Sequence, residues 1–340
     1  MRLSEFDYCL PKELIAQIPL KDRSSCRLMV VDKASGDISH KQFRDLPQYL
    51  SCGDALILND TKVFPARIFA KRATGAKVEI LLLKNLGDNK FNCLIKPSRI
   101  KLNESVYFND AGSSAKLIAR SPGKAVIEFA KDRDPEKLIT DFGVMPLPAY
   151  IKREAQDFDR DSYQTVYAKN EGAVASPTAG LHFDQDLLKK MEDNGINMGF
   201  LTLHVGIGTF KPIKSEEIEN HKMEEEEFNI PKSTADLVKK TKDMGKKVFA
   251  VGTTSARGLE SQARGQKSLT AAKGKTDLYI YPGFRFNIVD SLLTNFHLPK
   301  STLFLLVCAF AGRDLMFKAY EAAIRERYRF YSYGDAMLVL

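Results

Sequence analysis

The sequence has few cysteines, and their spacing argues against two common kinds of site. The five cysteines among 340 residues are odd in number, lie far apart and form no CxxC pair. This distribution speaks against a disulfide framework and against a zinc site, and it favours a reducing compartment. We therefore expect a cytoplasmic protein that binds no metal.

Long hydrophobic runs are also missing. The longest, residues 303–311, is about half of what a helix needs to cross a bilayer. Glu5 and Asp7 precede any apolar run, so we expect neither a signal peptide nor a membrane-bound protein. Because 44% of the residues are hydrophobic, the chain can bury a sizeable core, and its length suggests two domains or one large one.

The net charge of +8 is unevenly distributed along the chain. Residues 66–150 contain fifteen Lys or Arg and nine Asp or Glu, so this segment carries most of the positive surplus. Two interpretations remain open. The lysines could protect strand edges from aggregation, or they could contact the backbone of a nucleic acid.

Residues 66–130 show short β-like runs separated by turns that contain Gly or Asn-Asp. This pattern is typical of a small antiparallel barrel. The runs are residues 66–70, 78–83, 92–95, 105–108, 116–119 and 125–129. A short apolar strand, residues 57–59, precedes them.

After Pro146-Leu147-Pro148 the pattern changes to strands that alternate with small-residue loops and helices. We predict a helix capped by Asp184 and ended by Gly195, then a strand over 196–205. A helix started by Ser233 and Asp236, a strand over 247–251 and a further helix follow. The fold class is therefore α/β, with a mixed or barrel-like sheet. We expect residues 1–65 and 150–340 to form this domain, interrupted by a β-barrel over 66–149.

Four loops of the second half combine small and polar residues. The loop 172–183 is rich in Gly, Ala and Ser, so a ligand could approach its backbone; it could also be a tight turn with His182 inside the core. The loop 204–210 begins like a dinucleotide fingerprint but has Lys211 where the third glycine should be, which argues against a Rossmann cofactor. Gly252-Thr253-Thr254-Ser255 precedes Arg257 at a helix start, which suits a carboxylate or phosphate.

The fourth loop, residues 293–302, holds Asn295, His297, Lys300 and Ser301 just before what we expect to be a buried strand. Near the C-terminus, residues 325–333 interleave basic and aromatic side chains. That segment suits stacking on unpaired bases, and equally an ordinary amphipathic helix end. The acidic run 224–227 is typical of a solvated turn or helix face.

As an ordered set, these motifs resemble the S-adenosylmethionine:tRNA ribosyltransferase-isomerases of queuosine synthesis. The resemblance covers the whole chain. The matching stretches are residues 14–17 with Arg23, 59–63 with 65–67, 163–168, 177–183, 204–210, 251–255, 276–283, 294–301 and 333–337. One departure is that Glu224, Glu225 and Glu226 follow Met223 where the family usually has His-Ser-Glu. A catalytic histidine is therefore missing at that place, whereas Glu226 keeps the matching carboxylate.

The resemblance implies an α/β domain interrupted by a small β-barrel, which agrees with the organisation inferred above. It also implies that S-adenosylmethionine is a co-substrate that donates its ribosyl moiety, and that no other cofactor or metal is needed. The acceptor is 7-aminomethyl-7-deazaguanine at the wobble position of tRNA, and the products are epoxyqueuosine, adenine and methionine. We expect the protein to act as a monomer.

From motif position we predict three groups of site residues. The candidate acids and bases are the histidines His182, His204 and His297. The residues expected to bind S-adenosylmethionine are Thr178, Gly180, Gly206, Gly208, Thr209, Thr253, Thr254, Ser255, Arg257 and Asn295, with Arg257 on the methionine carboxylate. Those expected to contact tRNA are Asp60, Lys62, Arg67, Tyr163 and Lys300.

Two rival functions make different demands on the sequence. An S-adenosylmethionine-dependent methyltransferase should have a glycine-rich loop after its first strand and an acidic end to its second, and neither is evident. A non-enzymatic RNA-binding protein would explain the charge and the segment 325–333. It would not explain polar, small-residue loops at successive strand ends.

Overall fold

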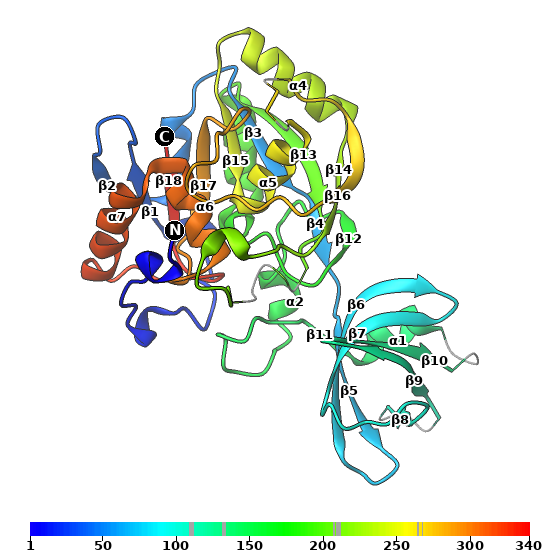
Figure 1. Cartoon of the computed structure of the whole chain (residues 1–340). Coiled ribbons are helices and arrows are strands. Elements are labelled where there is room, and N and C mark those ends of the chain that lie inside the picture. The colour runs from blue at the N-terminus through cyan, green and yellow to red at the C-terminus, as the bar shows by residue number, and fades with distance from the viewer. Residues whose placement is uncertain (109–111, 131–133, 207, 209–211, 264, 267) are drawn as a thin grey trace.

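The protein, described from a computed structural model, combines a large α/β domain with a separate small barrel (Figure 1). The structure describes residues 1–108, 112–130, 134–206, 208, 212–263, 265–266 and 268–340. The mixed α/β fold class predicted from the sequence, with its inserted antiparallel barrel, is confirmed.

A nine-stranded mixed sheet forms the α/β domain, in the order β16-β14-β13-β3-β15-β17-β18-β1-β2. Its four central strands run parallel: β13 (Asn197–Leu203), β3 (Ala55–Asn59), β15 (Val248–Val251) and β17 (Ser291–Asn295). On one side lie β14 (Glu226–Ile230) and β16 (Ala272–Thr276), both antiparallel to their neighbours. On the other lie β18 (Ala336–Val339), β1 (Arg27–Val31) and β2 (Ile38–Gln42), so the two ends of the chain meet in adjacent strands.

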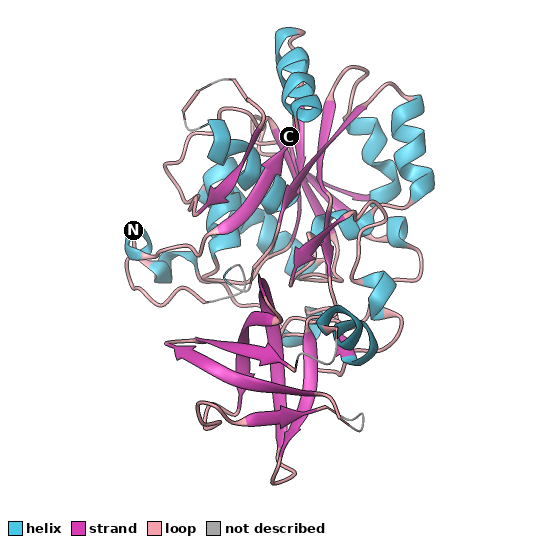
Figure 2. Cartoon of the chain, turned by 90° about the vertical axis from the view of Figure 1, so that its right-hand side faces the viewer, coloured by secondary structure: helices cyan, strands magenta, loops and turns pink. Residues whose placement is uncertain are grey.

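Helices cover both faces of this sheet (Figure 2). Successive residues of β1 point to opposite faces, as the pleat requires: Met29 and Val31 join the core of one face, Leu28 and Val30 that of the other. The helices that contribute to the first core are α4 (Lys232–Asp243), α5 (Gly252–Ala263), α6 (Thr302–Ala311) and α7 (Arg313–Arg325). The second core is covered by α3 (Gln185–Asp193) and a 3₁₀ segment, Phe43–Tyr49.

The barrel is a closed six-stranded antiparallel sheet. In order around it stand β5 (Arg67–Arg72), β6 (Lys77–Gly87), β7 (Lys90–Lys96), β10 (Lys124–Phe129), β9 (Ser114–Ser121) and β8 (Ser105–Tyr107), and β8 pairs back to β5. The short strand β11 (Gly143–Val144) extends β5, and α1 (Pro135–Phe142) packs Leu138 and Ile139 onto the barrel core. Strands β4 (Thr61–Val63) and β12 (Asn170–Ala173) pair beside the junction, and α2 (Asp159–Ser162) follows the return from the barrel.

Most predicted elements are present, and two details differ. The Asp184 carboxylate accepts from Leu187 N–H at 2.7 Å and caps α3 as expected. Helix α4 instead starts at Lys232 behind Pro231, with no side-chain cap. The predicted buried strand at 303–311 is wrong, because this run forms helix α6, capped by Ser301. A helix that is buried on all sides is apolar at nearly every position, and so is a buried strand. An unbroken apolar run therefore does not show which of the two forms.

Candidate active site at the carboxyl ends of the parallel strands

The four central strands end at the same edge of the sheet, and each is followed by a predicted motif. Asp60 follows β3, His204 follows β13, Gly252 follows β15 and Phe296 follows β17. A Cβ on Gly252 would lie 3.6 Å from Cβ of Ala179, so the loop 177–183 reaches the same edge. Loops at the carboxyl ends of parallel strands are the usual place for a ligand in α/β proteins.

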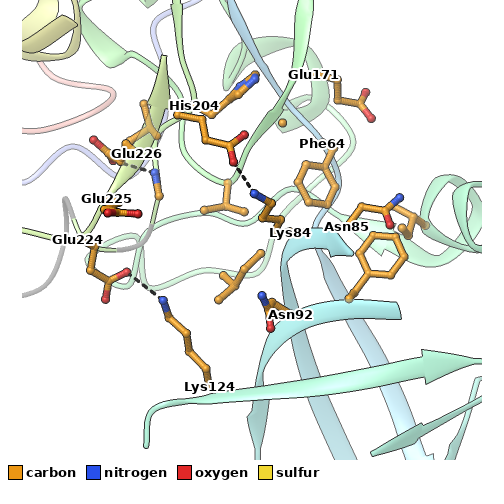
Figure 3. A pocket seen from close by; sticks show the side chains of 18 of the residues that line it. Phe64, Lys84, Asn85, Asn92, Lys124, Glu171, His204, Glu224, Glu225 and Glu226 are labelled. Carbon is orange, nitrogen blue, oxygen red and sulfur yellow. Dashed lines mark hydrogen bonds and ion pairs between the residues drawn. The ribbon is translucent and has the colours of Figure 1, made fainter. Parts of the chain in front are cut away.

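A cleft of about 620 Å³ lies between this edge and the barrel (Figure 3). We call it the interdomain cleft. Its barrel side includes Lys84 and Lys124, and its α/β side includes His204, Gly206 and the acidic run 224–227. Lys124 Nζ lies 3.6 Å from a carboxylate oxygen of Glu224, and Lys84 pairs with Glu227 across the same gap. Both pairs are partly exposed, so salt screens them and each stabilises the protein only slightly.

His204 is the predicted histidine that lines the cleft. Its Nδ1 lies 2.8 Å from the Thr61 hydroxyl, and its Nε2 has no hydrogen-bond partner among the described residues. Burial lowers the pKa of His204, while the carboxylates of Glu227 and Asp60 act in the opposite direction. The ring is therefore neutral at pH 7, and those two carboxylates favour the imidazolium once it forms.

Gly172 allows His204 to take this position. Gly172 has φ +152°, and a Cβ there would lie 2.8 to 3.0 Å from three atoms of the imidazole. No side chain other than hydrogen fits between this backbone and the ring. The sequence suggested a small-residue loop that a ligand could approach, or a tight turn, but not this contact.

Glu226 departs from the solvated face that we expected for the acidic run, whereas Glu225 and Glu227 are exposed. Glu226 lies in β14, where alternate residues are buried, and it forms an ion pair with Arg257 in which each side chain is 3% exposed. Its other oxygen accepts from Gly206 N–H at 2.8 Å, and Arg257 Nε donates to Leu278 O at 3.0 Å. In this conformation the Arg257 guanidinium already holds Glu226, so its contact with the methionine carboxylate stays a prediction.

Further predicted residues lie in two loops, residues 204–210 and residues 252–255. Gly206 lines the cleft, and a Cβ on Gly208 would lie 3.0 Å from Cβ of Glu224. Thr209 lies outside the described residues. Thr253, Thr254 and Ser255 are all buried at the start of α5, where Ser255 donates to Val251 O at 2.7 Å. The Thr254 hydroxyl is buried and has no partner among the described residues.

A second cavity, of about 310 Å³, is lined by Thr178, Asn295 and His297 together with Tyr150 and Tyr331. We call it the aromatic pocket. Burial lowers the pKa of His297 to about 3, so its ring is neutral, and Nε2 lies 2.7 Å from the Thr294 hydroxyl. The aromatic pocket thus holds two of the predicted substrate residues and one predicted histidine.

His182 is buried behind this pocket in a hydrogen-bond chain. Thr178 donates to Asn295 Oδ1 at 2.9 Å, Asn295 Nδ2 lies 3.0 Å from His182 Nε2, and His182 Nδ1 lies 3.2 Å from Cys26 Sγ. Burial and the cations of Arg23 and Arg329 lower the pKa of His182 to about 3. Burial likewise raises the pKa of the Cys26 thiol, so the Cys–His–Asn set is no activated nucleophile.

Gly180 has a structural explanation. A Cβ at this position would lie 2.0 Å from the Tyr167 hydroxyl oxygen. The glycine therefore allows close packing of a tyrosine, and not the approach of a ligand as predicted.

The five residues predicted to contact tRNA do not form one surface. Tyr163 is fully buried, and Asp60 is buried with its carboxylate held by Thr202 and Asn170. Neither side chain is offered to a macromolecule in this conformation, so the structure lends these two predictions no support. Arg67 pairs with Glu79 at 3.3 Å, Lys300 pairs with Asp7 at 2.5 Å, and Lys62 is exposed.

The segment 325–333 is also not a stacking platform. The aromatic side chains of Tyr328, Phe330, Tyr331 and Tyr333 are all buried. All four are core residues with an amphipathic pattern, and Tyr331 also lines the aromatic pocket. Among the residues that the structure describes, no group of three His, Cys, Asp or Glu could hold a metal ion. No helix in the described part of the chain is long and apolar enough to span a bilayer.

These features define an α/β protein with an inserted barrel and with a cleft between the barrel and the carboxyl ends of the parallel strands. The sequence profile of the family described as queuosine biosynthesis protein matches residues 3–339, and the chain belongs to this family.

Proteins named S-adenosylmethionine:tRNA ribosyltransferase-isomerase are similar over the full length of both chains. The protein from Sulfurihydrogenibium sp. (strain YO3AOP1) is 49% identical and that from Halothermothrix orenii 48% identical, each with 100% of both chains covered. The crystal structure of S-adenosylmethionine tRNA ribosyltransferase from Thermotoga maritima is 37% identical, with a TM-score of 0.58 over 99% of this chain and 100% of that one.

Proposed function

We propose that this chain transfers and isomerises the ribosyl moiety of S-adenosylmethionine onto 7-aminomethyl-7-deazaguanine at the wobble position of tRNA. The products are epoxyqueuosine in tRNA, adenine and methionine. The names of full-length relatives support the two substrates. The observation that carries the proposal within this chain is the placement of His204 at the strand ends, in a cleft wide enough for a second, larger substrate.

The first chemical step requires a base. The sulfonium acidifies the C5′ protons of the ribose, and removal of one of them gives an ylide. His204 Nε2 is our candidate to take this proton, because the ring is neutral at pH 7 and Glu227 and Asp60 favour the resulting imidazolium.

The later steps move the ribose and release the two products. Adenine departs more easily when one of its ring nitrogens is protonated, and the amine of the 7-deazaguanine then attacks the sugar. The ribose rearranges to the epoxycyclopentane, and methionine departs with the electron pair of its carbon–sulfur bond. This scheme requires no metal and no cofactor besides S-adenosylmethionine as co-substrate.

We further propose that the protein acts as a monomer in the cytoplasm. The tRNA backbone contacts the barrel side of the interdomain cleft through Lys84 and Lys124, which exchange their ion pairs with Glu227 and Glu224 for pairs with phosphates. Phosphate contacts of this kind position a nucleic acid without reading its sequence.

A product assay tests the proposal. The protein is incubated with S-adenosylmethionine and with tRNA that carries the 7-aminomethyl-7-deazaguanine precursor, and free adenine is measured. Adenine and methionine in equal amounts are expected. S-adenosylhomocysteine would instead identify a methyltransferase, and tRNA binding without any product would identify a simple RNA-binding protein.

A further inference from the structure

The aromatic pocket and the interdomain cleft are neighbours along two segments of chain. Val174 lines the cleft, and Thr178, four residues later, lines the aromatic pocket. In the same way Gly206 lines the cleft and Pro212 lines the aromatic pocket. The two segments are joined by a hydrogen bond from Val174 N–H to Val205 O at 3.1 Å. One molecule with two chemically different parts could therefore extend from one cavity to the other.

The two cavities differ in charge. The interdomain cleft is lined by carboxylates of Glu171 and of the run 224–227 together with three lysines. Among the described residues, the one Lys, Arg, Asp or Glu side chain that lines the aromatic pocket is Lys300, which is paired with Asp7. A cationic sulfonium or amine is better accommodated beside the carboxylates, and an uncharged group is better accommodated in the aromatic pocket.

The wall of the aromatic pocket is suited to a flat ring. Tyr150 and Tyr331 stack with centroids 4.4 Å apart and an interplanar angle of 29°. Tyr331 has φ +73°, an unusual backbone conformation for a bulky residue, and a tight turn closed by Gly334 N–H on Tyr331 O at 2.9 Å stabilises it. Leu3, Ile213 and Leu298 supply apolar contacts around the aromatic pair.

Two polar atoms in this wall are available for a ligand. The Tyr331 hydroxyl is buried and has no hydrogen-bond partner among the described residues. Of the His297 ring nitrogens, Nε2 is engaged by Thr294, and Nδ1 makes no hydrogen bond to a described residue. A neutral imidazole and a phenol can each donate or accept, which matches the mixed donors and acceptors on the edge of a purine.

We infer that the aromatic pocket binds the adenine ring of the ribosyl donor, and that His297 and the Tyr331 hydroxyl contact its polar edge. The sulfonium and ribose then extend past the segment 174–178 toward His204 in the interdomain cleft. This inference rests on the proposed function, because it takes the adenosyl group as part of the substrate.

Adenine binding to the full-length protein tests the inference. The affinity for free adenine is measured by titration calorimetry for the wild type and for two variants of the pocket. Leu298→Trp fills the pocket from its rim, where Leu298 is 37% exposed, and should weaken adenine binding about tenfold or more. Tyr331→Phe removes only the hydroxyl and should weaken it about fivefold.

Two matched controls should bind adenine like the wild type. Leu102→Trp makes the same change at an exposed leucine of the barrel, and Tyr279→Phe removes another buried, unpartnered hydroxyl that does not line the pocket. If the wild type fails to bind adenine at millimolar concentration, or if Leu298→Trp and Tyr331→Phe bind it unchanged, the inference is overturned.

The product assay separates this result from the proposed function. A wild type that turns over, with a KM for S-adenosylmethionine that Leu298→Trp raises and a KM for tRNA that it leaves unchanged, supports both. Turnover with an unchanged KM for S-adenosylmethionine in Leu298→Trp overturns the pocket assignment alone. Tight adenine binding without any turnover overturns the proposed reaction and leaves the pocket assignment standing.

Discussion

The side-chain amide of Asn295 donates to Nε2 of His182 at 3.0 Å, and this bond assigns the proton of a buried imidazole to the other nitrogen. The orientation of the amide is fixed by two further bonds, because Nδ2 also donates to Tyr331 O at 3.1 Å and Oδ1 accepts from Thr178. His182 Nε2 therefore accepts, and Nδ1–H points at Cys26. His182 thereby positions Asn295 in the wall of the aromatic pocket, and its Nε2 lone pair is engaged in this bond.

Replacing Asn295 with alanine should destabilise the protein. The change leaves His182 Nε2 and the Thr178 hydroxyl without their partner, which costs about 1–3 kcal/mol of unfolding free energy. Urea denaturation measures this loss, with Asn287→Ala as the control, since the Asn287 side chain bonds only to Arg285 O at an exposed site. In long-range ¹H–¹⁵N spectra of the wild type, His182 should be protonated at Nδ1; a proton at Nε2 would contradict the assignment.

Replacing Gly172 should lower turnover in the same way as replacing His204. Gly172→Ala introduces a methyl group within 3.0 Å of the imidazole, so the ring must move away from Thr61. We expect kcat for adenine release to fall at least about tenfold, as in His204→Ala, with an unchanged KM for tRNA. Gly75→Ala is the control, because Gly75 also has positive φ but no atom within 4 Å of the added carbon. Wild-type turnover in both Gly172→Ala and His204→Ala would exclude His204 as the base.

The buried histidines should make the fold sensitive to acid. His182 and His297 have pKa values lowered from 6.5 to about 3, so between these values the unfolded chain binds protons that the folded chain does not. The unfolding free energy is therefore highest above pH 6.5 and falls as the pH drops, by about 1.4 kcal/mol per pH unit for each histidine. Urea unfolding at pH 5.5 and 7.5 measures the slope, and His297→Gln should reduce it by one histidine. An unchanged slope would show that His297 titrates normally in the folded state.

Variants of Glu226 and Arg257 can separate the contribution of this pair to protein stability from its contribution to the position of the loop at Gly206. Glu226→Gln leaves the buried Arg257 cation without its counter-charge and should cost about 3–5 kcal/mol of unfolding free energy. The double variant Glu226→Leu with Arg257→Met replaces both charges by apolar groups and should recover most of that stability.

Turnover should not recover in the double variant. Gly206 N–H has lost its acceptor there, so the loop that begins at Gly206 is no longer fixed beside His204. Denaturation and kcat measured on the same three proteins test this separation. A double variant that is both stable and fully active would show that the pair contributes to stability alone.

Lys84 and Lys124 should contribute to tRNA binding through charge. In the double variant Lys84→Gln with Lys124→Gln we expect the KM for tRNA to rise about tenfold near physiological salt and its salt dependence to become shallower. The KM for S-adenosylmethionine should not change. The double variant Lys239→Gln with Lys240→Gln, an equal change of charge at exposed sites of α4, serves as the control. If the salt dependence is the same in all variants, the tRNA does not contact this side of the cleft.

The sequence alone determined the features that depend on neighbours along the chain. Short β-like runs between turns that contain Gly or Asn-Asp predicted the barrel strands, and the carboxylate of Asp184 predicted a helix start, because turns and caps act over a few residues. The same local patterns predicted that the polar loops follow directly after strands. The order of these loop motifs along the chain predicted the family.

Only the tertiary structure decided which of the predicted site residues face a cavity. His182 and His204 occupy similar loops in the sequence, yet one is buried against Asn295 and the other lines the cleft. The sequence around Arg257 predicted an anion-binding site. In the structure Glu226, from a strand distant in sequence, neutralises the guanidinium. Burial and partners come from segments far apart in the chain, and they set protonation and availability through the local dielectric, which no short stretch of sequence specifies.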